Sequence, residues 1–185
     1  MPPKVRFTRE SVLTAAFDMV REGGLETLNA RSLAARVGSS TQPLFRVFSG
    51  MDEIKEQVIL MAQQRFDEYV TAYQNDEMPA YKRTGMAYIR FAREEKQLFR
   101  MLFMCEHTEA ERRSIAAGTI DYVHNAGIES TGLNMQQMER FHFHMWIYVH
   151  GLASMIATGY LDLGDEMAST LITECYQGLR KQFVP

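Results

Sequence analysis

The sequence predicts an all-α fold of about nine helices, and three observations support this. Alternating strand-like patterns are nearly absent, and apolar residues recur at the 3.6-residue helical period along almost the whole chain. Only five prolines occur in 185 residues, so long helices are possible. Glycines stand where periodic segments end, as at Gly24 and Gly38. We expect a three-helix head over residues 1–50 and a helical body over residues 51–185.

The head is expected to contain three helices joined by short turns. Thr8 is a candidate N-cap for the first helix, which has an apolar face and ends at Gly23–Gly24. Asn29 can cap a short second helix that runs to about Val37 and is stopped by Gly38. A third helix follows at once, with Ser40 as its N-cap, and ends near Phe48. Helix, short turn and helix inside a three-helix cluster is the helix-turn-helix arrangement.

The body is expected to hold the remaining helices. Ser49–Asp52 is typical of a capping box and opens a helix to about Tyr73. Helices at about 79–93 and 96–104 follow, the first with Tyr81, Thr84, Tyr88 and Phe91 on one face. A second capping box, Thr108–Glu111, opens a helix to about Asn125, and residues 127–132 are expected to form a loop. Helices at about 134–159 and 165–183 complete the chain.

The segment at about 134–159 is apolar on nearly every face, which predicts burial nearly all round. One chain does not easily cover all these faces, so we expect a homodimer formed by this helix and the last one. The alternative is that the faces pack only within one chain. The expected interface residues are Tyr148, Gly151, Leu152, Met155, Leu171, Cys175 and Leu179.

Charge is unevenly distributed between the two parts. Residues 1–50 carry seven Lys or Arg against four Asp or Glu, whereas residues 51–185 carry thirteen against nineteen. A basic head on an acidic body is typical of a protein that contacts nucleic acid at one end. The alternative is a plain helical hairpin whose polar residues are merely solvated.

In a helix-turn-helix, the second helix enters the major groove of DNA and the first lies across the phosphate backbone. Gln42 can pair with adenine, and Arg46 with guanine or a phosphate. Arg6 and Arg9 lie where an N-terminal arm can reach a neighbouring groove or phosphate. The expected DNA-binding residues are Asn29, Arg31, Ser40, Thr41, Gln42, Phe45 and Arg46.

Three stretches resemble the TetR family of bacterial repressors: residues 8–17, residues 24–38, and Leu44–Phe48 before a long helix. The resemblance covers about residues 6–60 at motif level, and Trp146–Gly151 is similar to one TetR-type C-terminal subgroup. It implies a transcription regulator, a repressor that binds a palindromic double-stranded operator as a homodimer. It also implies a cavity in the body for a small hydrophobic effector that releases or modulates DNA binding.

Aromatic residues and one histidine of the body are the candidates for lining that cavity. They are Tyr88, Phe91, Phe99, Phe103, Tyr122, Phe141, His142 and Trp146. His124 is a second candidate for a polar anchor.

The head departs from the TetR pattern at three positions. Phe45 stands where Tyr is common, Val47 where His is common, and Met51 where Lys is common. Loss of contacts to the DNA backbone would weaken binding and flatten its salt dependence. The alternative function is therefore an all-helical ligand-binding or interaction protein whose head binds DNA weakly or not at all.

Other functional classes lack support in the sequence. There is no glycine-rich phosphate loop, no Gly-x-Ser-x-Gly and no His-Glu-x-x-His, so we expect no enzyme, no metal site and no cofactor. Two cysteines, Cys105 and Cys175, cannot build a disulfide framework. Residues 1–7 lack the apolar core of a signal peptide, and no apolar run of about eighteen residues occurs. We expect a cytoplasmic bacterial protein that does not enter a membrane.

Overall fold

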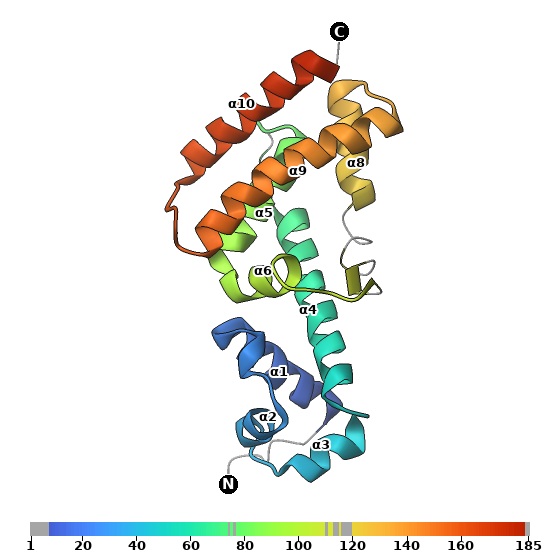
Figure 1. The fold of residues 1–185 in the computed structure, drawn as a ribbon, viewed down its shortest axis with the longest axis vertical. Helices are drawn as coiled ribbons and strands as arrows, with labels where there is room; N and C mark the ends of the chain where they lie inside the picture. The colour runs from blue at the N-terminus through green and yellow to red at the C-terminus, as the bar shows by residue number, and fades with distance from the viewer. Residues whose placement is uncertain are drawn as a thin grey trace.

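The fold is all-α, as the sequence predicts. The computed structural model describes residues 8–183 apart from residues 74, 76, 110, 113, 114 and 116–119, and every regular element in this described part is helical. A small head lies at one end of an elongated molecule and a larger body at the other (Figure 1). None of the described helices is both long and apolar enough to cross a membrane.

Three α-helices and a short 3-10 turn form the head: α1 (Arg9–Gly23), η1 (Leu25–Thr27), α2 (Ala30–Arg36) and α3 (Thr41–Val47). Thr8 and Asn29 cap α1 and α2 as predicted, each in a reciprocal capping box with the serine three residues on. Ser40 occupies the predicted N-cap position of α3, although its hydroxyl accepts no capping hydrogen bond. Gly38 has φ of 66°, the left-handed conformation that turns the chain between α2 and α3. The predicted boundaries of the helix-turn-helix are thus confirmed.

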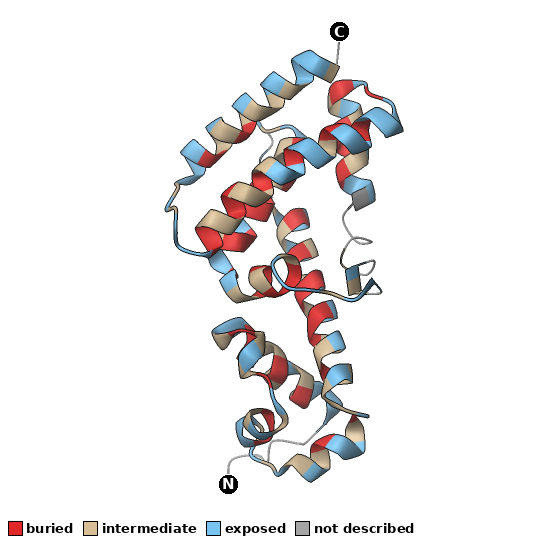
Figure 2. Cartoon of the chain, in the orientation of Figure 1, coloured by how far each residue is buried: buried red, intermediate tan, exposed pale blue. Residues whose placement is uncertain are grey.

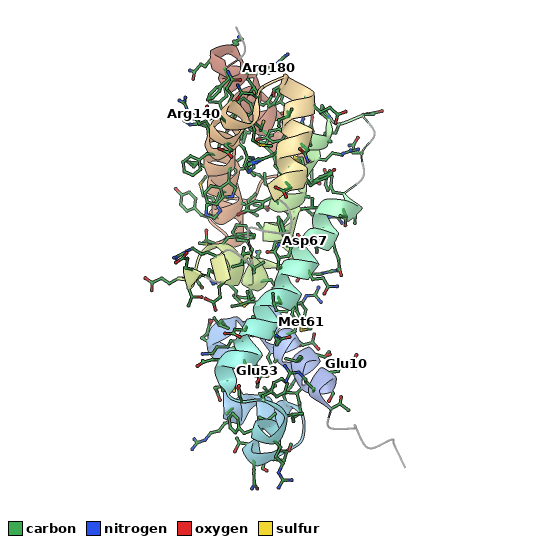
Figure 3. The ribbon with its side chains drawn as sticks, turned by 90° about the vertical axis from the view of Figure 1, so that its right-hand side faces the viewer. Glu10, Glu53, Met61, Asp67, Arg140 and Arg180 are labelled. Atoms are coloured by element: carbon green, nitrogen blue, oxygen red, sulfur yellow. The ribbon has the colours of Figure 1, made fainter. Side chains whose placement is uncertain are left out.

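The body is built around α5 (Ala80–Glu94), which packs against all the other labelled helices of the body. Those helices are α4 (Met51–Ala72), α6 (Lys96–Phe103), α8 (Ile120–Thr131), α9 (Met135–Ala157) and α10 (Asp165–Phe183). The long helix α4 packs on α1 and runs from the head into the body. Figure 3 shows Glu53, Met61 and Asp67 in that order along it, with Arg140 and Arg180 at the far end of the body.

The start of α4 differs from the prediction. The capping box expected between Ser49 and Asp52 is instead an interaction of Ser49 with Glu53. Glu53 Oε2 accepts hydrogen bonds from the Ser49 N–H at 2.7 Å and from its hydroxyl at 2.9 Å. Because a glutamate side chain is one methylene longer than aspartate, it spans the extra residue and lets the helix begin at Met51.

The prediction of a loop at residues 127–132 is also wrong. Helix α8 continues to Thr131, and the connection from α8 to α9 spans only residues 132–134. A Cβ atom on Gly127 would lie 2.3 Å from Met138 Cε. The glycine therefore permits close packing of α8 on α9 rather than a turn. The Thr108–Glu111 capping box is present, with the Thr108 N–H donating to Glu111 Oε2 at 2.7 Å. Much of the helix expected after it lies outside the described residues.

One face of α9 is left exposed in the single chain. Met138, Phe141 and Met145 are buried, as expected for the long apolar stripe. Phe143 and Ile147, however, are 58% and 51% exposed, and Figure 2 shows exposed residues along the outer side of α9. The prediction of burial nearly all round therefore does not hold within one chain.

A buried carboxylate joins the head to the body. Glu95, at the corner between α5 and α6, has a side chain that is 1% exposed. Arg21 of α1 donates to both of its oxygens, Nε to Oε2 and Nη2 to Oε1, each at 2.6 Å. Arg65 of α4 donates to Oε1 at 3.3 Å, and the Tyr69 hydroxyl lies 3.4 Å from the same oxygen. A buried charge is stable only when paired and hydrogen-bonded, so this Glu95 cluster (Glu95, Arg21, Arg65 and Tyr69) holds three helices together.

Substituting Arg21→Ala is expected to lower the free energy of unfolding by about 1–3 kcal/mol, because buried Glu95 loses its bidentate partner. This loss of stability is smaller than for a fully buried ion pair, since the Arg21 side chain is 47% exposed. Urea unfolding followed by circular dichroism measures it. The control, Arg36→Ala, breaks a solvent-exposed pair with Glu22 and should leave the unfolding midpoint nearly unchanged. Equal losses in the two variants would contradict this role of Glu95.

Candidate nucleic-acid interface and internal cavity

The second helix of the helix-turn-helix, α3, lies at the end of the molecule farthest from the body (Figure 1). Its inner side is anchored by Leu44 and Phe48, which are buried in the core of the head. Neither Gln42 nor Arg46 forms a hydrogen bond or ion pair with any residue in the described part of the chain. Their polar groups are therefore free to bind another molecule. The outer side presents Ser40, Gln42, Phe45 and Arg46 as exposed residues, with Thr41 half-buried.

The residues that open α2 divide into one that supports the fold and one that is free. Asn29 Oδ1 accepts hydrogen bonds from the N–H groups of Arg31 and Ser32, both at 3.1 Å, so capping occupies this oxygen. The Arg31 side chain is exposed and forms no ion pair with a described residue. The charged group of Arg31 therefore faces solvent, whereas the side-chain oxygen of Asn29 is occupied by capping.

Arg9, expected in an arm that reaches DNA, is bound within the head instead. Its guanidinium pairs with Glu53 at 2.6 Å, donates to the Val47 carbonyl at 3.0 Å and lies 4.4 Å from the centre of the Phe48 ring. Hydrogen bonds from the Ser49 N–H and from Arg9 lower the pKa of the Glu53 carboxyl to about 2. Arg9 therefore fastens α1 to the start of α4. Arg6 lies outside the described residues.

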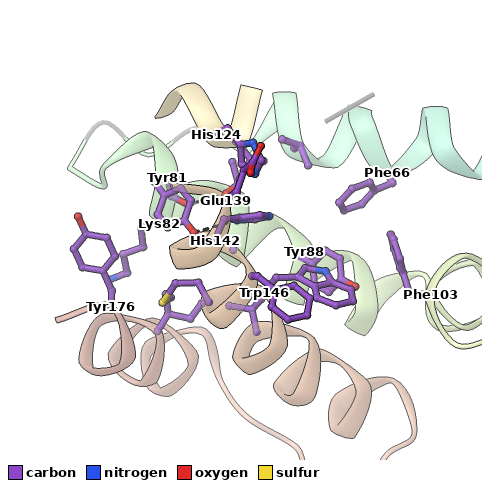
Figure 4. A pocket seen from close by; sticks show the side chains of 18 of the residues that line it. Phe66, Tyr81, Lys82, Tyr88, Phe103, His124, Glu139, His142, Trp146 and Tyr176 are labelled. Atoms are coloured by element: carbon purple, nitrogen blue, oxygen red, sulfur yellow. Dashed lines mark hydrogen bonds between the residues drawn. The ribbon is translucent and has the colours of Figure 1, made fainter. Parts of the chain in front are cut away.

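The body contains a cavity of about 970 Å³ that is open to solvent in part (Figure 4). Four of the eight residues assigned to its wall from the sequence do line it, namely Tyr88, Phe103, His142 and Trp146, and so does His124. Several residues that no sequence pattern predicts in the cavity wall also line it, among them Phe66, Tyr81, Lys82, Val123, Glu139 and Tyr176. The wall thus draws on α4, α5, α6, α8, α9 and α10.

The other four assigned residues do not line the cavity. Phe91, Phe99 and Phe141 are fully buried behind the wall in contacts with other aromatic rings. Phe141, for example, packs edge-on against Tyr176 of α10. Tyr122 is 50% exposed. Helical periodicity identifies inward-facing residues, but it cannot separate a packed core from the wall of a cavity.

Two tyrosine–histidine hydrogen bonds join α5 to α9. The Tyr81 hydroxyl lies 3.1 Å from His142 Nδ1, and the Tyr88 hydroxyl lies 2.9 Å from His150 Nδ1. The pairs are about two helical turns apart on each helix, so they fall on facing sides. Burial raises the pKa of both phenols far above the usual range, and both therefore remain protonated.

The two histidines are held in their neutral form. Burial, with a smaller contribution from the nearby His124, lowers the pKa of His142 to about 4. The His124 and His142 rings meet edge-on with their centres 5.1 Å apart. Burial also lowers the pKa of His150. No cluster of three or more possible metal ligands occurs among the described residues.

The residues expected to form a dimer interface lie mainly between α9 and α10 of the same chain. Leu152 is buried, and the others apart from Gly151 are half-buried and pack against the core: Tyr148, Met155, Leu171, Cys175 and Leu179. Gly151 is also half-buried, but a Cβ atom on it would meet no other atom within 4 Å. The large apolar side chains that these two helices leave exposed include Phe143, Ile147 and Met167.

Residues 81–175, which are 95 of the 185 residues, match the family model described as tetracyclin repressor-like, C-terminal domain. No curated protein matches the chain. The family match covers α5, α6, α8 and α9 and the first part of α10.

Solved structures of transcriptional regulators share the fold over nearly the whole chain. One from Pseudomonas aeruginosa PAO1 has a TM-score of 0.73 at 12% identity, over 95% of this chain and 93% of that one. A TetR-like regulator from Rhodococcus sp. RHA1 has a TM-score of 0.67 at 19% identity, over 97% and 98%. A TetR family protein from Vibrio parahaemolyticus has a TM-score of 0.65 at 22% identity, over 91% and 96%. At these identities the likeness concerns the fold alone.

The low pKa of His142 predicts a loss of stability in mild acid. The unfolded chain binds a proton at the ordinary histidine pKa near 6.5, whereas the folded chain binds it only near pH 4. The free energy of unfolding therefore falls as the pH is lowered from 6.5 towards 4. The decrease that His142 causes between pH 7.5 and pH 5 is about 2 kcal/mol. Urea unfolding measures the free energy of unfolding at the two pH values, and the decrease between them should be smaller for His142→Gln than for the wild type. As a control, His144→Gln removes a histidine from the exposed side of the same helix. If the free energy of unfolding of His142→Gln fell as much between the two pH values as that of the wild type, His142 would not be the group responsible.

Proposed function

Because the chain belongs to the TetR family of transcriptional regulators, we propose that it is a repressor that binds a palindromic operator as a homodimer. A small apolar ligand in the body cavity releases or weakens this binding, in the bacterial cytoplasm. The observation that carries the proposal is that one chain combines an exposed, unpaired polar face on α3 with a cavity of about 970 Å³ in the body.

DNA recognition is assigned to the outer side of α3. Gln42 pairs with the edge of an adenine, and Arg46 with guanine or a phosphate. Phe45, 47% exposed where a tyrosine is common in the family, offers an apolar surface to a thymine methyl group. Ser40 and Thr41 add hydroxyl contacts, and Arg31 binds the phosphate backbone. Asn29 acts indirectly, because its side-chain oxygen caps α2.

Dimer formation is assigned to the exposed apolar face of α9. Phe143 and Ile147 are four residues apart, so they lie on the same side of the helix, and Gly151 follows one turn later without a side chain. Burying the exposed half of each side chain against a second copy stabilises the dimer by about 1 kcal/mol per side chain. This moves the interface from the residues expected at first, such as Leu152 and Leu171, to the neighbouring face.

The Glu95 cluster is the proposed link between the cavity and the head. Tyr88 on α5 and Phe103 on α6 line the cavity, and Glu95 lies at the corner between these two helices. A ligand that displaces either helix moves Glu95, to which Arg21 of α1 is bound in a bidentate pair. Such a ligand changes the affinity for DNA only if it binds the protein more tightly with the head in one position than with the head in the other.

A mobility-shift assay with the DNA upstream of the chain's own gene tests the function. The wild type should shift this DNA at low salt, and Arg46→Ala should weaken binding by about tenfold to a hundredfold, because it removes a charge-assisted contact to a base or phosphate. Arg36→Ala changes the net charge equally but removes an arginine that is paired with Glu22, so its binding should stay close to the wild type. No shift of any DNA at low salt would favour the alternative, an all-helical ligand-binding protein.

Sedimentation tests the dimer. Ile147→Glu places a charge in the proposed interface and should convert the dimer to a folded monomer, because an unpaired charge is costly to bury. Gln64→Glu, at an exposed position of α4, should leave the dimer intact. A monomeric wild type at micromolar concentration, or a dimer that survives Ile147→Glu, would argue against this interface.

A further inference from the structure

The two tyrosine–histidine pairs differ in one respect. His150 uses both ring nitrogens, because its Nδ1 bonds to Tyr88 and its Nε2 lies 3.3 Å from the Ser154 hydroxyl. His142 bonds to Tyr81 through Nδ1, and no described residue pairs with its Nε2. One turn after His142 the chain carries Trp146 where His150 has Ser154, and no hydrogen bond joins His142 to Glu139, one turn before it.

The proton on His142 can be placed from its neighbour. His142 Nδ1 is the one hydrogen-bond partner of the Tyr81 hydroxyl among the described residues, so the hydroxyl hydrogen is satisfied there only if Nδ1 accepts it. A neutral imidazole that accepts at Nδ1 carries its hydrogen on Nε2. His142 therefore presents an Nε2–H donor without a protein partner, and its ring lines the cavity (Figure 4).

The charged groups of the cavity wall lie where it meets solvent. Arg112, Glu139 and Arg180 are exposed and Lys82 is half-buried, so water screens all four. Phe66, Tyr88, Phe103 and Trp146 line the part of the cavity beyond His142 (Figure 4). Lys82 and Glu139 lie on the same side of the cavity as His142 (Figure 4), and their opposite charges offset each other. A ligand carboxylate or ammonium group beside His142 would therefore lose its water to face one attractive and one repulsive charge, which is unfavourable.

From this geometry we propose that the ligand is a neutral, largely apolar molecule with one hydrogen-bond acceptor, of the ketone or ester class, held by the Nε2–H of His142. Its hydrocarbon part fills the aromatic side of the cavity, and its carbonyl oxygen accepts the free hydrogen. The inference rests on the proposed function only in taking the cavity as the effector site.

Fluorescence of Trp146 provides the measurement, because it is the single tryptophan of the chain and lines the cavity. Three probes of similar size separate the possibilities: hexanophenone, hexylbenzene, in which a methylene replaces the carbonyl, and para-pentylbenzoate, which adds a negative charge. Hexanophenone should bind about fivefold to tenfold more tightly than hexylbenzene, the effect of one hydrogen bond. It should also bind more tightly than para-pentylbenzoate.

The ratio of hexanophenone to hexylbenzene affinity assigns this preference to His142. His142→Leu should reduce the ratio to about one, whereas His142→Gln, which keeps an N–H donor, should restore part of it. Because both probes are measured on the same variant, a general loosening of the cavity cancels in the ratio. Equal affinity of the wild type for hexanophenone and hexylbenzene would overturn the proposal, as would tighter binding of para-pentylbenzoate. Neither result depends on DNA binding, so the proposed function fails or stands separately.

Discussion

The buried Glu95 carboxylate is the constraint on which the arrangement of head and body depends. Water does not reach it, so its charge is stable only while Arg21 of α1 and Arg65 of α4 remain in place. Apolar contacts between helices tolerate small shifts, but a bidentate ion pair at 2.6 Å does not. The position of the head is therefore tied to the corner between α5 and α6, the two helices that carry Tyr88 and Phe103 in the cavity wall.

Polar groups inside the body also hold its helices in place relative to one another. The two tyrosine–histidine bonds fix the register of α5 against α9, which apolar packing alone specifies weakly. One of these pairs is saturated by Ser154, and the other leaves a donor in the cavity wall. The same hydrogen-bonded seam thus supports the fold and supplies the polar group that a mostly apolar cavity needs to orient a ligand.

The sequence predicts local features well and tertiary ones poorly. Thr8, Asn29 and Gly38 mark the helix ends of the head because capping and left-handed backbone depend on the residue itself. The sequence predicts a loop at Gly127, but the small size of this glycine serves a contact with Met138 on another helix. Phe91 and Phe141 are buried in the core although the sequence predicts them in the cavity wall, because the helical period does not distinguish core from cavity. No pattern links Arg21 to Glu95, which lie 74 positions apart.

The central claim is that the cavity and the DNA-binding head are energetically coupled through Glu95. Coupling between two binding sites is reciprocal, so it is visible from the ligand side. Titrating hexanophenone against Trp146 fluorescence, with and without saturating DNA from upstream of the gene, measures it directly. The account predicts affinities that differ by about fivefold to a hundredfold between the two conditions, and a smaller difference in Glu95→Gln. Equal affinities with and without DNA in the wild type would contradict the claim.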